Sequence, residues 1–221
     1  MKIEDVDLNF LGHAGFVVRY KNKVFVIDPY HVSEAVPKAD IILITHSHSD
    51  HCSIKDIQKL SRKGTMVLCP VDCQSTLMKV KGVDVNIVEK DEVLDFGNFK
   101  IECLPAYTSN PRHSQNEGWL GYLLKFDKTI IYFAGDTDNI PEIKRLSGYG
   151  KKGNHFVAVL PVAGDVVMNA LTAANAASLL NPSLAIPMSY GAGLYGTVED
   201  AKRFVELCRE KGIRAEVMEK T

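Results

Sequence analysis

Short apolar segments separated by turn residues open the chain and predict β-strands. They are rich in Val, Ile and Phe, and Gly12, Gly15 and the stretch 21–23 interrupt them. The fourth segment begins with four consecutive apolar residues, which is typical of a strand buried on both faces. The expected strands are Val6–Leu11, Phe16–Tyr20, Val24–Ile27 and Ile41–Thr45.

Helical periodicity begins at Ser53, which is suited to cap a helix that continues to about Arg62. Asp72 is expected to cap a second helix that runs to Lys79. Two later segments also have the composition or the amphipathic spacing of a helix. They are Thr172–Leu180 and Val198–Lys211.

The middle of the chain is rich in strand patterns, and the last third alternates strand with helix. Strands that follow one another early, with strand–helix–strand units late, predict a mixed α/β sandwich rather than a doubly wound sheet. The further expected strands are Met66–Cys69, Val85–Val88, Glu92–Phe96, Lys100–Leu104, Leu120–Phe126, Thr129–Phe133, Phe156–Leu160, Leu184–Pro187 and Ile213–Met218.

Composition and charge narrow the class of protein. The chain has 221 residues, of which 46% are hydrophobic and 24% charged, and no linker divides it, so residues 1–221 are expected to form one globular domain. The 26 basic and 27 acidic side chains leave a net charge of −1, which gives no electrostatic reason for a nucleic-acid or membrane partner. The sequence contains neither an apolar signal segment nor a membrane segment, so a cytoplasmic protein is expected. Whether the chain forms a homo-oligomer is left open.

The strongest chemical signal is the segment Thr45–His51, which follows the apolar run directly. Its sequence, T-H-S-H-S-D-H, places three imidazoles and a carboxylate within six residues. These groups hold Zn²⁺, Mn²⁺ and Fe²⁺ in proteins, and the end of a buried strand gives them a rigid support. A polar loop that is rich in histidine by chance is the alternative. The segment predicts a metal site, with Zn²⁺ preferred and Mn²⁺ or Fe²⁺ as alternatives.

The pattern T-H-x-H-x-D-H resembles the metal-binding signature of the metallo-β-lactamase superfamily. Further segments in the order of that family extend the resemblance from Leu8 to about Gly196. Trp119–Tyr122 and Gly12–Gly15 resemble elements of its L-ascorbate-6-phosphate lactonase-like branch. The resemblance implies a four-layer αβ/βα sandwich, the metallo-β-lactamase fold, with one or two metal ions per chain along one edge.

The resemblance also implies how the signature divides its ligands between two neighbouring metal ions. The family assigns the first two histidines, here His46 and His48, to one ion. It assigns the Asp-His pair that follows, here Asp50 and His51, to the other ion. The motif matches without a gap, so each role transfers to a single position of this chain.

Two later positions complete the implied set. Asp136 resembles the carboxylate of the Gly-Asp-Thr element, which bridges both ions, and two carboxylate oxygens can span ions about 3.5–4 Å apart. Its alternative is a helix cap before Pro141, a role expected instead for Asp138. His113 is the only histidine between the signature and Asp136, and it is the candidate third imidazole of the first site; a mobile surface histidine is the alternative.

Three residues are expected around the ligands. Asp28 matches a carboxylate with which the family orients the histidine loop, because metal-bound imidazoles donate their second N–H to such a partner. His13 is expected near the mouth of the site, beside the ligands or as a weak one, although a core or hairpin role is equally compatible. Ser189 departs from the branch, whose P-M-H-Y pattern has a histidine there that closes the second site. A hydroxyl is a weaker ligand, so the second ion is in doubt.

The resemblance implies a metal-dependent hydrolase in which a metal-bound hydroxide attacks an ester, lactone or phosphodiester of a small molecule. Asp50 is expected to carry a proton to the leaving group, and Tyr107, Arg112 and Tyr190 are candidate substrate contacts. Because of Ser189, the alternative is a degenerate member that binds one metal or a small ligand without catalysis. The near-neutral charge disfavours a nuclease of the same fold.

Overall fold

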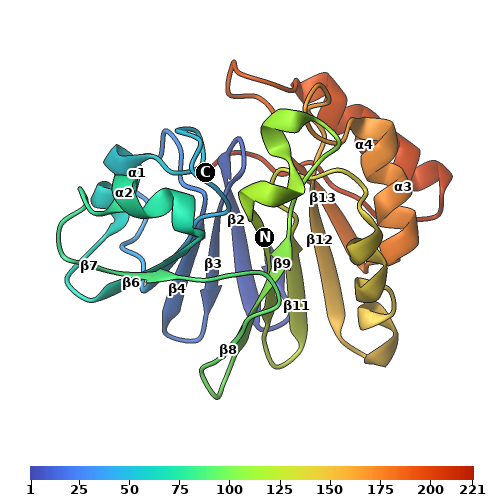
Figure 1. The fold of residues 1–221 in the computed structure, drawn as a ribbon. Coiled ribbons are helices and arrows are strands. Elements are labelled where there is room, and N and C mark those ends of the chain that lie inside the picture. Colours follow the sequence, from blue (N-terminus) through green and yellow to red (C-terminus); the bar gives the residue numbers. More distant parts are fainter.

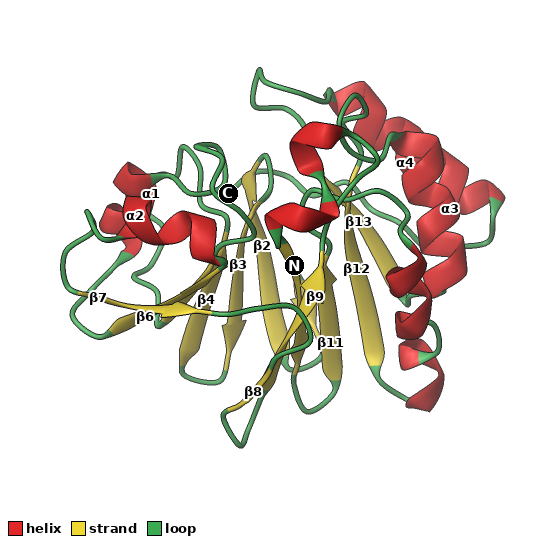
Figure 2. Ribbon diagram, in the orientation of Figure 1, coloured by secondary structure: helices red, strands yellow, loops and turns green.

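The computed structural model describes residues 1–221, except for the side chains of residues 151 and 152. Two mixed β-sheets face each other, and helices cover the outer face of each sheet (Figures 1 and 2). The predicted four-layer αβ/βα sandwich is therefore confirmed. Among the described residues, no helix is both long and apolar enough to cross a membrane.

The first sheet has seven strands that lie side by side in the order of the sequence. Its last four strands are parallel, so their carboxyl ends meet at one edge. The strands are β1 (Lys2–Ile3), β2 (Val6–Gly12), β3 (Gly15–Tyr20), β4 (Lys23–Ile27), β5 (Ile41–Leu43), β6 (Thr65–Cys69) and β7 (Val83–Ile87).

The second sheet has six strands in the order β13-β12-β11-β10-β9-β8. Three of them, β11, β12 and β13, are parallel and also end at a common edge. The strands are β8 (Val93–Asp95), β9 (Lys100–Pro105), β10 (Leu120–Lys125), β11 (Thr129–Phe133), β12 (His155–Pro161) and β13 (Leu184–Met188).

Helices α1 and α2 lie over the first sheet, and α3 and α4 lie over the second (Figure 1). Ser53 caps α1, as predicted, by accepting a hydrogen bond from the amide of Asp56. The α-helices are α1 (Ile54–Leu60), α2 (Gln74–Leu77), α3 (Ala170–Leu180) and α4 (Val198–Glu210). The 3₁₀ turns are η1 (Val71–Cys73), η2 (Pro111–His113), η3 (Gln115–Glu117), η4 (Pro141–Leu146) and η5 (Tyr149–Lys152).

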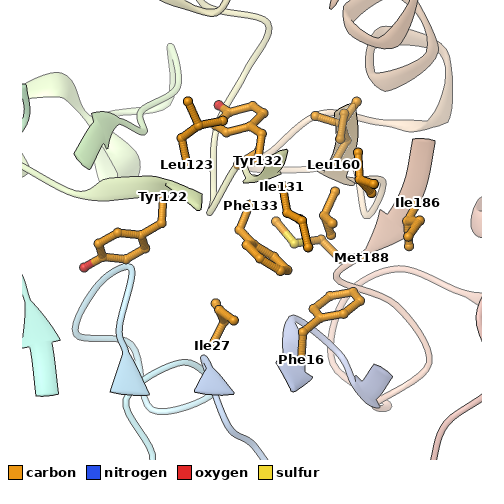
Figure 3. Packing of buried hydrophobic residues seen from close by; sticks show 14 of the residues in the cluster. Phe16, Ile27, Tyr122, Leu123, Ile131, Tyr132, Phe133, Leu160, Ile186 and Met188 are labelled. Atoms are coloured by element: carbon orange, nitrogen blue, oxygen red, sulfur yellow. The ribbon is translucent and has the colours of Figure 1, made fainter. Parts of the chain in front are cut away.

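Apolar side chains from the inner faces of both sheets fill the space between them. Phe16 and Ile27 of the first sheet point toward Ile131 and Phe133 of the second (Figure 3). The ring centroids of Phe16 and Phe133 are 5.4 Å apart, and both rings are removed from water. This burial fixes one sheet against the other and thereby sets the relative position of their edges.

Three local predictions are wrong. The segment Ile213–Met218 forms only an isolated bridge, between Ala185 and Ala215, because it passes the edge of the second sheet without extended pairing. Asp72 does not cap α2; its carboxylate accepts hydrogen bonds from Trp119 Nε1 and Cys73 Sγ, and the helix ends at Leu77.

The role expected for Asp138 is the third. The turn η4 begins after Ile140 and has no side-chain cap. Asp138 Oδ2 instead accepts hydrogen bonds from the amide and the hydroxyl of Ser109. It thus ties the loop after β11 to the loop that carries His113.

Candidate metal centre

The histidine-rich segment forms a tight turn between strand β5 and helix α1. The amides of His51 and Cys52 both donate to the carbonyl oxygen of His48, at 3.0 and 2.7 Å. A buried strand on one side and a capped helix on the other hold this turn in place. The side chains of the signature therefore start from a fixed backbone.

One buried carboxylate, Asp28, connects two of the imidazoles. Its Oδ1 accepts from the Thr45 amide at 2.8 Å, and its Oδ2 accepts from the Thr45 hydroxyl at 2.6 Å and from His51 Nδ1 at 2.8 Å. Since the Thr45 hydroxyl gives its proton to Asp28, it accepts from His46 Nδ1 at 2.9 Å. This network assigns a proton to Nδ1 of His46 and of His51, so Nε2 is the atom through which each ring would bind a metal.

Asp136 follows β11 after a turn that requires glycine. Gly135 has φ +67°, and a Cβ there would lie 2.6 Å from the carbonyl oxygen of Leu120. Asp136 Oδ1 lies 3.6 Å from His51 Nε2, whereas Oδ2 lies 3.8 Å from His46 Nε2 and 3.7 Å from His113 Nδ1. One oxygen of this carboxylate thus faces His51, and the other faces His46 and His113.

The possible metal ligands fall into two groups. The first group consists of His46, His48, His113 and Asp136. His46 Nε2 lies 3.1 Å from His48 Nδ1, and the ligand atoms of His46, His48 and Asp136 all lie within 4.8 Å of one another. His113 stands outside that compact trio, but its buried Nδ1 has no hydrogen-bond partner among the described residues. The predicted third imidazole therefore lies beside the other two.

Trp119 supports the first group and was missed in the sequence. Its ring centroid lies 4.3 Å from that of His46, 4.9 Å from His48 and 4.8 Å from His113. Its Nε1 donates to Asp72 Oδ2 at 2.8 Å, which fixes the plane of the indole. The motif Trp119–Tyr122 signalled a family resemblance but not this contact, because nothing in the sequence pairs the indole with the histidines.

The second group consists of His13, Asp50 and His51, and Asp136 Oδ1 lies 3.6 Å from His51 Nε2. His13 Nε2 lies 2.8 Å from Asp50 Oδ2, and His51 Nε2 lies 3.6 Å from the same oxygen. One ligand atom from each of His13, Asp50 and His51 lies within 4.8 Å of the others. The structure therefore brings His13 into the site, where the sequence left its role open.

The two groups differ in their electrostatics. Burial, reinforced by the neighbouring imidazoles, holds the pKa of His46 well below its ordinary value, and burial also lowers the pKa of His113. Burial acts in the same direction on His51, but the carboxylates of Asp136 and Asp28 outweigh it and raise its pKa to about 9. Burial acts to raise the pKa of Asp50, yet the hydrogen bond to His13 and the charge of His51 lower it far below the ordinary range.

The donors of both groups fit a divalent transition metal. Two ligands of a tetrahedral Zn²⁺, each at about 2.1 Å, are about 3.4 Å apart. The donor separations that involve Asp136, between 3.6 and 3.8 Å, are close to that value. Neutral imidazoles such as His46 are in the protonation state that binds metal. The same donor types also suit Mn²⁺ and Fe²⁺, so the geometry supports a metal without choosing it.

A cavity of about 290 Å³ opens over both groups. Of the expected substrate contacts, Arg112 lines it, whereas Tyr107 and Tyr190 do not. Their hydroxyls donate within the protein, to Glu142 Oε2 at 2.9 Å and to the carbonyl oxygen of Met218 at 3.2 Å. Several other lining residues carried no signal in the sequence; they come from the loops after β12 and β13 and are Gly164, Val166, Val167 and Tyr195.

Comparisons with known proteins identify the family of the chain. The model of the β-lactamase superfamily domain matches residues 7–189. The chain belongs to the metallo-β-lactamase superfamily. Within it, the chain falls into the UPF0173 metal-dependent hydrolase family: a member from Koribacter versatilis is 31% identical over 227 residues, covering 94% of this chain and 95% of the relative.

Solved structures of this superfamily show the same fold. A candidate metal-dependent hydrolase from Parabacteroides distasonis superposes with a TM-score of 0.82 at 28% identity, over 98% of this chain and 94% of that protein. Igni18, a metallo hydrolase from Ignicoccus hospitalis, superposes with a TM-score of 0.78 at 25% identity, over 97% and 95% of the two chains. The predicted metallo-β-lactamase fold is confirmed.

Proposed function

We propose that the chain hydrolyses an ester, lactone or phosphodiester bond of a small molecule with the help of a divalent metal, preferably Zn²⁺. His46, His48, His113 and Asp136 would hold the ion. The observation that carries this proposal is the arrangement of Asp136, whose Oδ1 faces His51 while its Oδ2 faces His46 and His113. A carboxylate with only a structural role would not require three buried histidines around it.

The metal and the protein would divide the chemistry. When bound, a divalent metal polarises a carbonyl or phosphoryl oxygen and makes water acidic enough to react at neutral pH. Asp50 lines the cavity, and its Oδ2 is engaged with His13, which leaves Oδ1 to take up a proton and pass it to the leaving oxygen.

Arg112 favours a substrate that carries negative charge. Its side chain is exposed at the cavity, and no carboxylate pairs with it within the part of the chain whose side chains are described. A guanidinium binds carboxylate or phosphate oxygens in pairs. Val166 and Val167 add an apolar wall to the same cavity. Among the three bond types, the resemblance of Trp119–Tyr122 to the lactonase-like branch favours a lactone.

Metal content and turnover of His48→Ala test the proposal. We expect this variant to lose most of its metal and at least about 100-fold in activity, because it removes a direct ligand. His155→Ala is the matched control: its imidazole lies 3.1 Å from Glu4, outside both groups, and it should change neither quantity. Full metal occupancy in His48→Ala, measured by elemental analysis after purification without chelator, would contradict the ligand set.

A substrate screen separates the enzyme from the alternative suggested by Ser189. Metal-loaded protein is assayed against generic lactones, carboxylic esters and phosphodiesters, with and without a chelator. Turnover that stops when the chelator removes the metal supports the proposed hydrolase. Tight metal binding without turnover of any of these compounds would support a non-catalytic metal-binding protein instead.

A further inference from the structure

His13 and Ser189 are neighbours in the structure although they lie at opposite ends of the sequence. The amide of Ser189 donates to the carbonyl oxygen of His13 at 2.8 Å, and His13 forms an antiparallel bridge with Tyr190. Both residues have positive φ, 54° for His13 and 63° for Ser189. This backbone pairing joins the turn between β2 and β3 to the end of β13, so both side chains enter the same cavity.

Ser189 does not act as a donor toward the second group. Its Oγ is buried and forms no hydrogen bond with any described residue. It therefore contacts neither Asp50 nor His51 through a polar bond. The second group needs an imidazole from another position if it is to hold an ion with more than one nitrogen ligand.

His13 occupies the position from which such an imidazole can bind. Its side chain is 3% exposed, and its ring packs edge-on against His51 at 5.3 Å and Tyr30 at 5.9 Å between centroids. This packing holds Nε2 2.8 Å from Asp50 Oδ2. If a metal ion bound there, the proton of this hydrogen bond would be released and both atoms would serve as ligands.

We propose that His13 supplies the closing imidazole of a second metal position, together with Asp50, His51 and the Oδ1 atom of Asp136. The inference rests on the proposed metal-dependent function and adds to it a ligand for a second ion. The imidazole comes from the turn between β2 and β3 rather than from the end of β13, where Ser189 stands. Two imidazoles and two carboxylate oxygens then make a complete four-ligand set for Zn²⁺.

Zinc titration of His13→Asn tests this assignment. Asparagine tolerates the positive φ of His13, so the fold should survive, but its side chain is too short to reach the place of Nε2. We expect wild type to bind two ions and the variant to bind one, with the affinity for the second ion reduced at least about 100-fold. Zinc per chain is measured by equilibrium dialysis and elemental analysis over a series of free Zn²⁺ concentrations.

His31→Asn is the matched control. His31 also has positive φ, 49°, but it is exposed and does not line the cavity. It should keep both ions, which separates loss of a ligand from loss of a backbone conformation. Unchanged affinity for both ions in His13→Asn would overturn the assignment. Failure of wild type to bind even the first ion would instead overturn the proposed function.

A crystal structure of the zinc-loaded wild type tests without a variant whether His13 is a metal ligand. We expect His13 Nε2 about 2.0–2.1 Å from the second ion. If His13 still donates a hydrogen bond to Asp50 and stands clear of the ion, it is only a positioning residue for that carboxylate. That result would overturn the inference even if His13→Asn binds zinc more weakly.

Discussion

The two donor groups share Asp136 but differ in the charge that surrounds them. The first group holds three imidazoles around one carboxylate oxygen, and burial keeps the pKa of His46 well below its ordinary value. In the second group, carboxylates surround His51 and raise its pKa to about 9. The first group therefore offers a metal ion mainly imidazole nitrogens, whereas the second group offers it more negative charge from carboxylates.

This difference predicts different metal preferences on the two sides of Asp136. Imidazole-rich sets favour Zn²⁺, whereas oxygen ligands are also suited to Mn²⁺. The second position must in addition displace a proton from His51, since its raised pKa keeps it protonated at neutral pH. We therefore expect the first group to fill at lower metal concentration than the second.

The largest effect is expected from Asp136→Asn, because this change affects both groups at once. The amide keeps the size of the carboxylate but has one oxygen and no charge, so it cannot bridge. Both ions should bind at least about 100-fold more weakly, while the melting temperature of chelator-treated protein stays close to that of wild type. A lower melting temperature with unchanged metal content would mean that Asp136 has only a structural role.

A smaller and unequal effect is expected from Asp28→Asn. Asp28 accepts directly from His51 Nδ1 but reaches His46 only through the Thr45 hydroxyl. Loss of such an outer partner costs about 10–100-fold in metal affinity. The second ion should weaken by about that factor, and the first ion by less. Zinc titration monitors both steps, and equal weakening of the two ions would show that Asp28 does not distinguish the groups.

The smallest effect is expected from Ser189→His. Histidine is compatible with the positive φ at this position, but the second group already contains the imidazole of His13. The affinity for the second ion should change by less than about threefold. A gain of tenfold or more in the same titration would show that the group lacks an imidazole in wild type, and would argue against His13 as a ligand.

Much of the centre was predictable because its donors are contiguous in sequence. His46, His48, Asp50 and His51 follow β5 of the first sheet, whereas Asp136 follows β11 of the second, and its role beside them was implied by the resemblance to the metallo-β-lactamase superfamily. The fold class was predictable for a similar reason, since strand and helix periods are local properties.

The rest depends on pairings between distant segments, which a sequence pattern does not reveal. The place of His13 is set by its backbone bridge to Tyr190, which follows β13, and the orientation of Trp119 is set by its hydrogen bond to Asp72. Asp138 fails as a predicted cap because Ser109, on another loop, offers its side chain two donors. In each case a long-range contact outweighs the local preference.

The position of the centre between the two sheets has a consequence for stability. Every strand of the first sheet precedes every strand of the second in the chain, and the donors come from both halves. A bound ion would therefore act as a reversible cross-link between the halves, because neither half alone contains Asp136 together with the histidine signature. At a free metal concentration 100 times the Kd, such binding stabilises a fold by about 2.7 kcal/mol. The supply of metal would then affect the stability of the folded chain as well as its catalysis.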